Sequence, residues 1–285
     1  MKKGSFLFRI LFLLPIIIYS FLLILLPLIY VFFLSFCKSD SYGGVIYQFT
    51  FSNYLNIFDF TYLRILFKSC VIAFITTLIC IFISYPFALI LREKSVEVRN
   101  LVTKLVMLPF LTNSLIRTYG WITLLRKNGV INSGLLGLGI IQSPISFMYS
   151  NLGIIIGMTY TLLPFMILPV CSAVFKIDQN LIEASKDLGA SPFRIFKHII
   201  VPLTFSGVFN GSLMVFIPAI GYFFISDILG GGKVMIIGNL IKNQFLTARN
   251  WPFGSAISIF LIVITFLLVK LYQKLGGKLD DLGGM

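Results

Sequence analysis

Residues Asn180–Leu203 read NLIEASKDLGASPFRIFKHIIVPL, a charged stretch punctuated by glycine and proline between two long apolar runs. It carries the single histidine of the chain, His198, although the whole sequence is 58% hydrophobic and only 12% charged. A segment of this kind is costly to bury and must face water. Because it lies between two apolar runs, it marks where one membrane-crossing segment ends and the next begins.

The composition predicts an all-α, polytopic membrane protein. Mean hydropathy is +0.98, and the apolar residues of this 285-residue chain come in blocks about twenty long, enough to cross a bilayer as helices. The net charge of +13 does not indicate nucleic-acid binding, because lysine and arginine cluster at the ends of the apolar blocks. With one histidine, a metal site is not expected.

Six spans are predicted within a single transmembrane domain covering residues 1–285. Apolar length and flanking charge place them near Ile10–Phe36, Ser69–Leu91, Leu105–Leu125, Leu152–Phe175, Phe205–Leu229 and Ser255–Tyr272. One alternating set of connecting segments carries fourteen of the 23 lysines and arginines, and the other carries eight. The positive-inside rule therefore predicts that both termini and the charged stretch face the cytoplasm. The segment Val234–Leu246 is too short to cross, and predicts either an external amphipathic helix or a re-entrant piece.

Within the charged stretch, local signals predict a helix–turn–helix. Asn180 to Glu183 has capping-box spacing, and Gly189 can supply a left-handed residue that ends the first helix. Ser191–Pro192 is a typical helix start, and Pro202 is expected to end the second helix. Three interpretations remain open: an ordinary solvent-exposed cytoplasmic loop, a DNA-binding helix-turn-helix, or a short helical element that docks into a cleft of a cytoplasmic partner. Tethering at both ends to spans disfavours DNA reading.

The spacing of this stretch resembles the EAA loop of ABC-importer permeases. Glu183-Ala184-Ser185 is followed after three residues by Gly189, then after nine by Ile199 and Pro202; Ser185 and Val201 depart conservatively from the pattern. The resemblance implies that a loop over residues 176–204 inserts into a groove of an ATPase subunit. The contact residues so implied are Glu183, Ala184, Ser185, Asp187, Gly189, Ala190 and Phe193.

Other segments resemble the permease subunits of spermidine/putrescine importers, of the PotB/PotH type. They are Pro109–Trp121, Ile217–Gly232, Ile237–Leu246 and Asn250–Gly254. The resemblance implies a type I ABC-importer (MetI-like) fold in the bacterial cytoplasmic membrane. It also implies a second homologous permease, two copies of a cytoplasmic ATPase and an external polyamine-binding protein as partners. ATP and magnesium would bind to the ATPase and no cofactor to this chain, since the sequence has no P-loop.

A polyamine is a flexible polycation, so its path is expected to use carboxylates and aromatic faces. Asp227 is the only acidic residue inside a predicted span, and Arg117 the only basic one apart from Lys270 at the end of the last span. Two interpretations of Asp227 stay open: it contacts cargo, or it neutralises Arg117. The residues predicted to line the pathway are Asp227, Tyr222, Asn113, Arg117, Tyr119 and Trp121.

The alternatives to polyamine import are weaker. Another organic cation or an amino acid could be the cargo of the same kind of permease. An ion-driven secondary transporter is expected to place ionisable groups at mid-membrane, and this chain offers only Arg117 and Asp227. No nucleophile–base set or carboxylate pair predicts an enzyme, so no catalytic residue is assigned.

Overall fold

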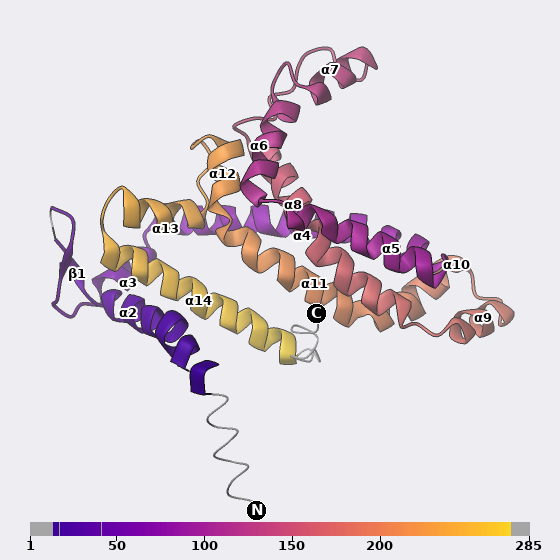
Figure 1. Cartoon of the computed structure of the whole chain (residues 1–285), viewed down its shortest axis with the longest axis horizontal. Helices are drawn as coiled ribbons and strands as arrows, with labels where there is room; N and C mark the ends of the chain where they lie inside the picture. Colours follow the sequence, from indigo (N-terminus) through magenta and orange to yellow (C-terminus); the bar gives the residue numbers. More distant parts are fainter. Residues whose placement is uncertain (1–13, 17, 41, 275–285) are drawn as a thin grey trace, which may run out of the picture. The chain divides into compact units, whose positions relative to one another are not determined.

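The computed structural model describes residues 14–16, 18–40 and 42–274, and these are mostly helical, which confirms the all-α prediction (Figure 1). A two-stranded antiparallel hairpin, β1 (Lys38–Ser39) with β2 (Val45–Ile46), is the sheet within the described residues. The helices are η1 Phe21–Leu25, α2 Leu26–Leu34, α3 Ser52–Ile57, α4 Phe60–Arg92, α5 Val96–Met107, η2 Leu108–Leu111, α6 Ser114–Leu125, α7 Val130–Gly137, α8 Asn151–Phe175, α9 Gln179–Asp187, α10 Pro192–Ile195, η3 Phe196–Ile200, α11 Val201–Gly221, α12 Phe223–Gly230, α13 Ile237–Leu246 and α14 Trp251–Lys274.

Among the described residues, five helices are long and apolar enough to cross a membrane: Leu14–Leu34, Phe60–Arg92, Asn151–Phe175, Pro192–Gly221 and Trp251–Leu271. They correspond to the first, second, fourth, fifth and sixth predicted spans. Residues 10–13 and 17 of the first predicted span, and both chain termini, lie outside the described residues. The second span is longer than predicted: its 33 residues correspond to about 50 Å of helix, well beyond the apolar core of a bilayer.

The third predicted span, Leu105–Leu125, is not one helix. α5 ends at Met107, the 3₁₀ turn η2 carries Pro109, and Thr112 is extended. Asn113 then caps α6, its side-chain oxygen accepting the N–H of Leu115 at 2.8 Å. Proline and a capping asparagine together end one helix and begin another, whatever the apolar content of the run.

The fifth predicted span, Phe205–Leu229, is shifted. Its helix begins at Pro192 and ends at Gly221, and a non-helical Tyr222 (φ −75°, ψ 60°) separates it from the short α12. Between α12 and the last span, α13 is a ten-residue helix, too short to cross. The choice between an external helix and a re-entrant piece stays open for α13.

The chain divides into two compact units, residues 1–63 with 240–264, and residues 64–239 with 265–285. In the first unit, α3 is held to the end of α2 because the buried Asn53 amide donates to the carbonyls of Ser35 and Cys37 at 2.9 and 2.8 Å. The last span begins at Trp251, with Pro252 in its first turn, and the side chain of Asn250 accepts the N–H of Phe253.

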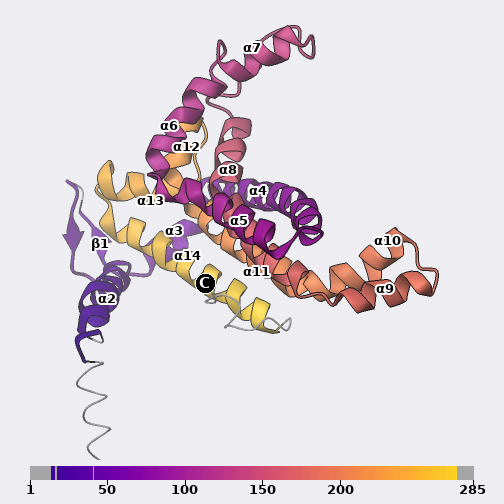
Figure 2. The same cartoon turned by 45° about the vertical axis from the view of Figure 1, so that its right-hand side comes forward.

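In the second unit, α8 and α11 lie side by side and form the centre of the packing (Figures 1 and 2). Their close approach depends on Gly207 and Gly211, one turn apart on α11. A Cβ at Gly207 would lie 2.4 Å from the Cβ of Ala173, and one at Gly211 would lie 2.7 Å from the sulfur of Met166. Small residues four apart let membrane helices approach closely, where van der Waals packing replaces the hydrophobic effect.

We predict that Gly207→Ala destabilises the protein by about 1–3 kcal/mol, since the added methyl group must displace backbone of α8. The measurement is the midpoint of thermal unfolding in detergent. The control is Gly134→Ala on α7, where a Cβ meets nothing within 4 Å. Equal losses in the two variants would contradict the packing explanation.

Candidate functional site

The charged stretch forms a helical hairpin, α9 and α10, at the end of α11 opposite to α12 (Figures 1 and 2). α9 begins two residues earlier than predicted, because Asp178 rather than Asn180 is its N-cap. The Asp178 carboxylate accepts the N–H of Asn180 at 2.9 Å, and Glu183 instead accepts from the side-chain amide of Gln179 at 3.1 Å. The predicted capping box is therefore wrong; Asp178 is an equally strong cap and comes first along the chain.

The glycine turn is confirmed. Gly189 has φ +77°, and its N–H donates to the carbonyl of Lys186 at 2.9 Å. The N–H of Ala190 reaches back to the carbonyl of Ser185 at 3.0 Å, so the last carbonyls of α9 are satisfied. In the part of the chain that the structure describes, a Cβ at Gly189 would meet no atom within 4 Å other than those of its chain neighbours. Within this chain, glycine is therefore required at position 189 by its positive φ and not by lack of space for a side chain.

α10 starts as predicted but does not stop as predicted. Ser191 caps it by accepting the N–H of Arg194 at 3.4 Å, and Pro192 is its first residue. It then continues through a π-helical turn, η3, into α11 without interruption. Pro202 does not end the helix, because the wider turn before it relieves the clash of its ring with the preceding carbonyls. The second arm of the hairpin and the span are therefore one continuous helix, Pro192–Gly221.

The base of the hairpin is anchored to α4. Four buried isoleucines, from both arms and both ends of the hairpin, form its core: Ile177, Ile182, Ile195 and Ile200. Tyr85 on α4 packs edge-on against Phe196, with ring centroids 5.5 Å apart, and its hydroxyl hydrogen-bonds to Thr204. The guanidinium of Arg92 donates to the carbonyl of Ile177 at 3.0 Å and to the Gln179 side chain at 3.1 Å. The base is therefore fixed to the span beside it.

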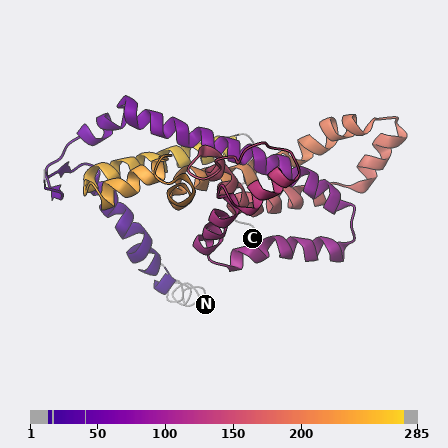
Figure 3. The same ribbon diagram turned by 90° about the horizontal axis from the view of Figure 1, so that it is seen from above.

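The hairpin projects from the end of the spans (Figure 3), and large apolar side chains on it are exposed. Leu188 is 88% exposed and Phe193 is 71% exposed, and Leu181 is also exposed; we call these three residues the apolar tip. Large apolar side chains so presented on a charged element are typical of a docking surface. Leu188 was not among the predicted contact residues, although its position directly before the turn glycine indicates that it lies at the end of the hairpin.

The structure places the implied ATPase-contact residues as follows. Glu183, Ala184, Asp187, Gly189 and Phe193 are exposed. Ser185 is half-buried and its hydroxyl donates to the carbonyl of Leu181 at 2.6 Å. Ala190 packs on the isoleucine core rather than outward.

The residues predicted to line a pathway lie on two neighbouring helices, α6 and α12, which pack against each other. Asn113, Arg117, Tyr119 and Trp121 come from α6 or its cap, whereas Tyr222 and Asp227 come from α12 or the residue before it. Tyr119 is 59% exposed, and the oxygen of Asn113 is used to cap α6. The predicted residues therefore lie on elements that pack together, their role in a pathway stays a prediction, and Asn113 also caps α6.

Arg117 is surrounded by aromatic rings rather than by carboxylates. Its guanidinium lies 5.2 Å from the ring centroid of Phe110 and 5.8 Å from that of Tyr160, which in turn packs against Trp121. Its Nε and one terminal nitrogen are buried without a hydrogen-bond partner among the described residues. Phe110 and Tyr160 were not foreseen, because they reach Arg117 from η2 and α8.

Asp227 has a different partner. Its carboxylate accepts from the side-chain amide of Asn239 at 2.6 Å, and that amide also donates to the carbonyl of Phe223. The oxygen of Asn239 accepts the N–H of Ile236, which fixes the turn after α12. Asn239 and the aromatic rings around Arg117 are thus contacts of these two charges, and the interpretation that Asp227 neutralises Arg117 stays a prediction.

The helix break at Tyr222 places the carbonyl end of α11, which carries partial negative charge, near Asp227. A Cβ at Gly238 would lie 2.3 Å from the carbonyl oxygen of Gly221, so a glycine there lets the chain press against the end of α11. The carbonyl end of a helix carries partial negative charge, and Asp227 follows within two turns. Cations are favoured at such a place. Among the described residues no cluster of His, Cys, Asp or Glu could hold a metal ion.

No family model matches the chain. It is 44% identical over 260 residues to the spermidine/putrescine transport system permease protein PotB of Haemophilus influenzae, covering 90% of this chain and 91% of that protein. It is 43% identical to PotB of Escherichia coli, covering 89% and 92%.

Among solved structures, a bacterial ABC transporter involved in import of the acidic polysaccharide alginate matches with a TM-score of 0.75 at 18% identity, covering 96% of both chains. The MetNI methionine ABC transporter in inward-facing form matches with a TM-score of 0.53 at 18% identity, covering 75% of this chain and 93% of that one. These likenesses establish the importer-permease fold and say nothing about cargo. By its identity to the PotB proteins over nine tenths of its length, the chain belongs to the family of spermidine/putrescine transport system permease proteins.

Proposed function

We propose that this chain forms half of the translocation pathway of an ATP-driven importer of spermidine or putrescine. The observation that carries the proposal is the identity of 44% to a spermidine/putrescine permease over 90% of the chain. The hairpin adds support, since it presents an apolar tip at the end of a continuous membrane helix. The chain acts as a multi-pass protein of the bacterial cytoplasmic membrane, with the hairpin and both termini in the cytoplasm.

The proposed assembly contains a second homologous permease, two copies of a cytoplasmic ATPase and an external polyamine-binding protein. ATP and magnesium bind on the ATPase, and this chain supplies no catalytic residue and holds no cofactor. One solved structure with a similar fold is a bacterial alginate ABC transporter in complex with an alginate pentasaccharide-bound periplasmic protein, which is an assembly of the same general kind.

In the proposed mechanism, ATP binding closes the ATPase pair and moves the apolar tip seated in it. Because α10, η3 and α11 are continuous, the movement passes into the span without a hinge at Pro202. The carbonyl end of α11, Tyr222 and Asp227 are then exposed to the cavity that receives cargo. A polycation is stabilised there by the carboxylate, by the helix end and by cation–π contacts of about 0.5–2 kcal/mol each.

The test is reconstitution of the complete transporter in proteoliposomes with loaded binding protein outside. We expect uptake of radiolabelled spermidine or putrescine that needs ATP and persists when proton and sodium gradients are collapsed. Uptake that followed an ion gradient and ignored ATP would overturn the proposal. Competition by unlabelled amino acids but not by polyamines would overturn the cargo assignment alone.

A further inference from the structure

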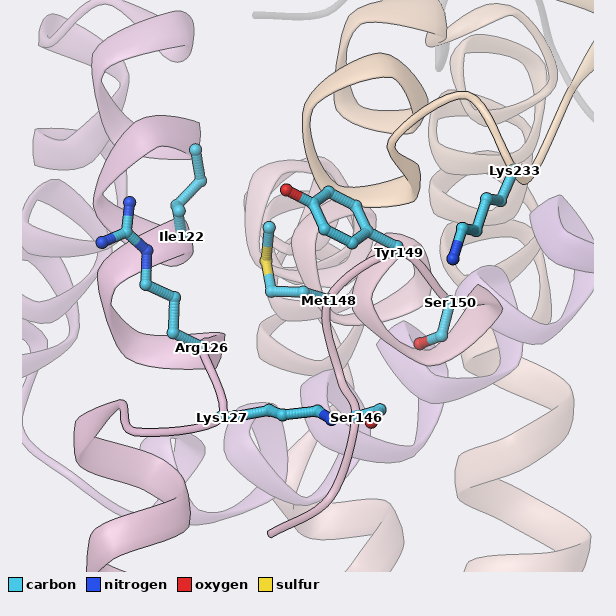
Figure 4. A pocket seen from close by; sticks show the side chains of 8 residues that line it. All are labelled: Ile122, Arg126, Lys127, Ser146, Met148, Tyr149, Ser150 and Lys233. Atoms are coloured by element: carbon cyan, nitrogen blue, oxygen red, sulfur yellow. The ribbon is translucent and has the colours of Figure 1, made fainter.

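A cavity of about 510 Å³ lies at the end of α6, away from the α9–α10 hairpin, and is bordered by three basic side chains (Figure 4). Arg126 and Lys127 directly follow α6, and Lys233 follows α12. In Figure 4, Lys127 extends toward Ser146, while Lys233 reaches toward Ser150 from another side. None of the residues that line the cavity is acidic. The cavity is therefore electropositive and suited to an anionic group.

The walls of the cavity are fixed by hydrogen bonds within the chain. The fully buried Asn132 donates to the carbonyls of Arg126 and Ile145 at 3.1 and 2.9 Å, and accepts the N–H of Ile145 at 2.9 Å. It thus ties the segment after α6 to the segment before α8. On the other side, the Ser150 hydroxyl donates to the carbonyl of Phe147 at 2.6 Å. The site is preformed rather than assembled by a ligand.

Tyr149 is held in the cavity in an uncommon conformation. Its φ is +60°, in the left-handed region that tyrosine rarely adopts, and its N–H donates to the carbonyl of Leu229 at 2.7 Å. Its ring lies on Gly231, where a Cβ would come within 2.1 Å of a ring carbon. Backbone strain of this kind concentrates at functional sites. A glycine at 231 and a strained tyrosine at 149 together shape one wall.

We infer that this cavity, the basic socket of Arg126, Lys127 and Lys233, receives acidic side chains from the rim of the external polyamine-binding protein. The inference rests on the proposed function and on the orientation predicted from lysine and arginine counts, in which residues 126–151 and 230–254 face outward. Polyamine cargo is excluded from the socket by like charge. A protein that binds a polycation must carry carboxylates about its cleft, and these complement the socket.

The experiment uses the complete transporter in vesicles of neutral phosphatidylcholine, with ATPase activity measured against the concentration of spermidine-loaded binding protein. In the triple variant Arg126→Gln, Lys127→Gln, Lys233→Gln, we expect the half-saturating concentration to rise about tenfold or more at low salt. The rate at saturating binding protein should be unchanged, and the dependence of half-saturation on NaCl should weaken. Gly231→Ala, which displaces the Tyr149 ring without removing charge, should shift half-saturation in the same direction.

The control is Lys38→Gln with Arg64→Gln, which removes two exposed cations from the other predicted external segment. An unchanged half-saturating concentration in the triple variant would overturn the socket, as would an equal shift in the control. If the triple variant raised the half-saturating concentration only in vesicles containing phosphatidylglycerol, the socket would bind a lipid headgroup, and its proposed role in docking would be overturned too. If wild-type transporter were not stimulated by loaded binding protein at all, the proposed function itself would fail, and the two failures are thereby distinguished.

Discussion

Replacing Gly189 with aspartate is expected to abolish ATP-driven uptake while leaving the permease folded. The left-handed turn at φ +77° costs a non-glycine residue about 1 kcal/mol, which a folded domain tolerates. Beyond its chain neighbours, no atom of the described residues lies within 4 Å of the position of the new Cβ, so the side chain has open space there. A carboxylate beside the apolar tip must instead be desolvated against the ATPase, and we expect uptake to fall by roughly a hundredfold or more.

The measurement combines uptake by proteoliposomes with recovery of the ATPase by tagged permease in mild detergent. Gly139→Asp is a closely matched control, because Gly139 also has positive φ (+68°) and open space around it, in the loop after α7. The control should keep both uptake and bound ATPase. Normal ATP-driven uptake in Gly189→Asp would remove the docking argument, and equal losses in both variants would assign the effect to backbone strain.

Asp227→Asn is expected to lower the apparent affinity for polyamine about 10- to 100-fold, the range that corresponds to losing one charge-assisted hydrogen bond. The substitution is mild for the fold, because an asparagine oxygen can still accept from the Asn239 amide that now lies 2.6 Å from the carboxylate. The effect should therefore appear as a higher KM for spermidine with normal assembly.

Glu97→Gln, in the exposed first turn of α5, is the matched change of a carboxylate to an amide and should leave uptake as in the wild type. If Asp227→Asn transported with wild-type KM, this carboxylate would not contact cargo. A loss of assembled transporter instead of a change in KM would make Asp227 a structural residue of the α12–Asn239 turn.

The sequence was sufficient where structure follows from local chemistry. The turn at Gly189 and the start at Ser191–Pro192 depend on residues within one turn of each other, and both were predicted. The break at Tyr222 was not, because the chain returns to press Gly238 against the carbonyl of Gly221. Apolar content alone does not distinguish a continuous helix from a broken one, which is also why the third span was misjudged.

The candidate pathway shows the same limit. Asp227 and Arg117 were identifiable as isolated charges in apolar surroundings, yet their partners come from other elements. Tyr160 reaches Arg117 from α8, and Asn239 reaches Asp227 from α13. A carboxylate–arginine pair is the simplest assumption for two isolated charges in apolar surroundings, whereas contacts with rings and an amide depend on packing between elements.

The π turn Phe196–Ile200 also fixes the angular phase between the apolar tip and the span. Such a turn is equivalent to one residue inserted into an α-helix, and each residue of an α-helix advances the direction by about 100°. Removing one residue within the turn would therefore leave a regular helix of nearly the same length and rotation, whereas removing one residue outside it would rotate everything before it by about 100° relative to α11. Sequence length between the turn glycine and the span is therefore as much a part of the coupling as the side chains that the tip presents.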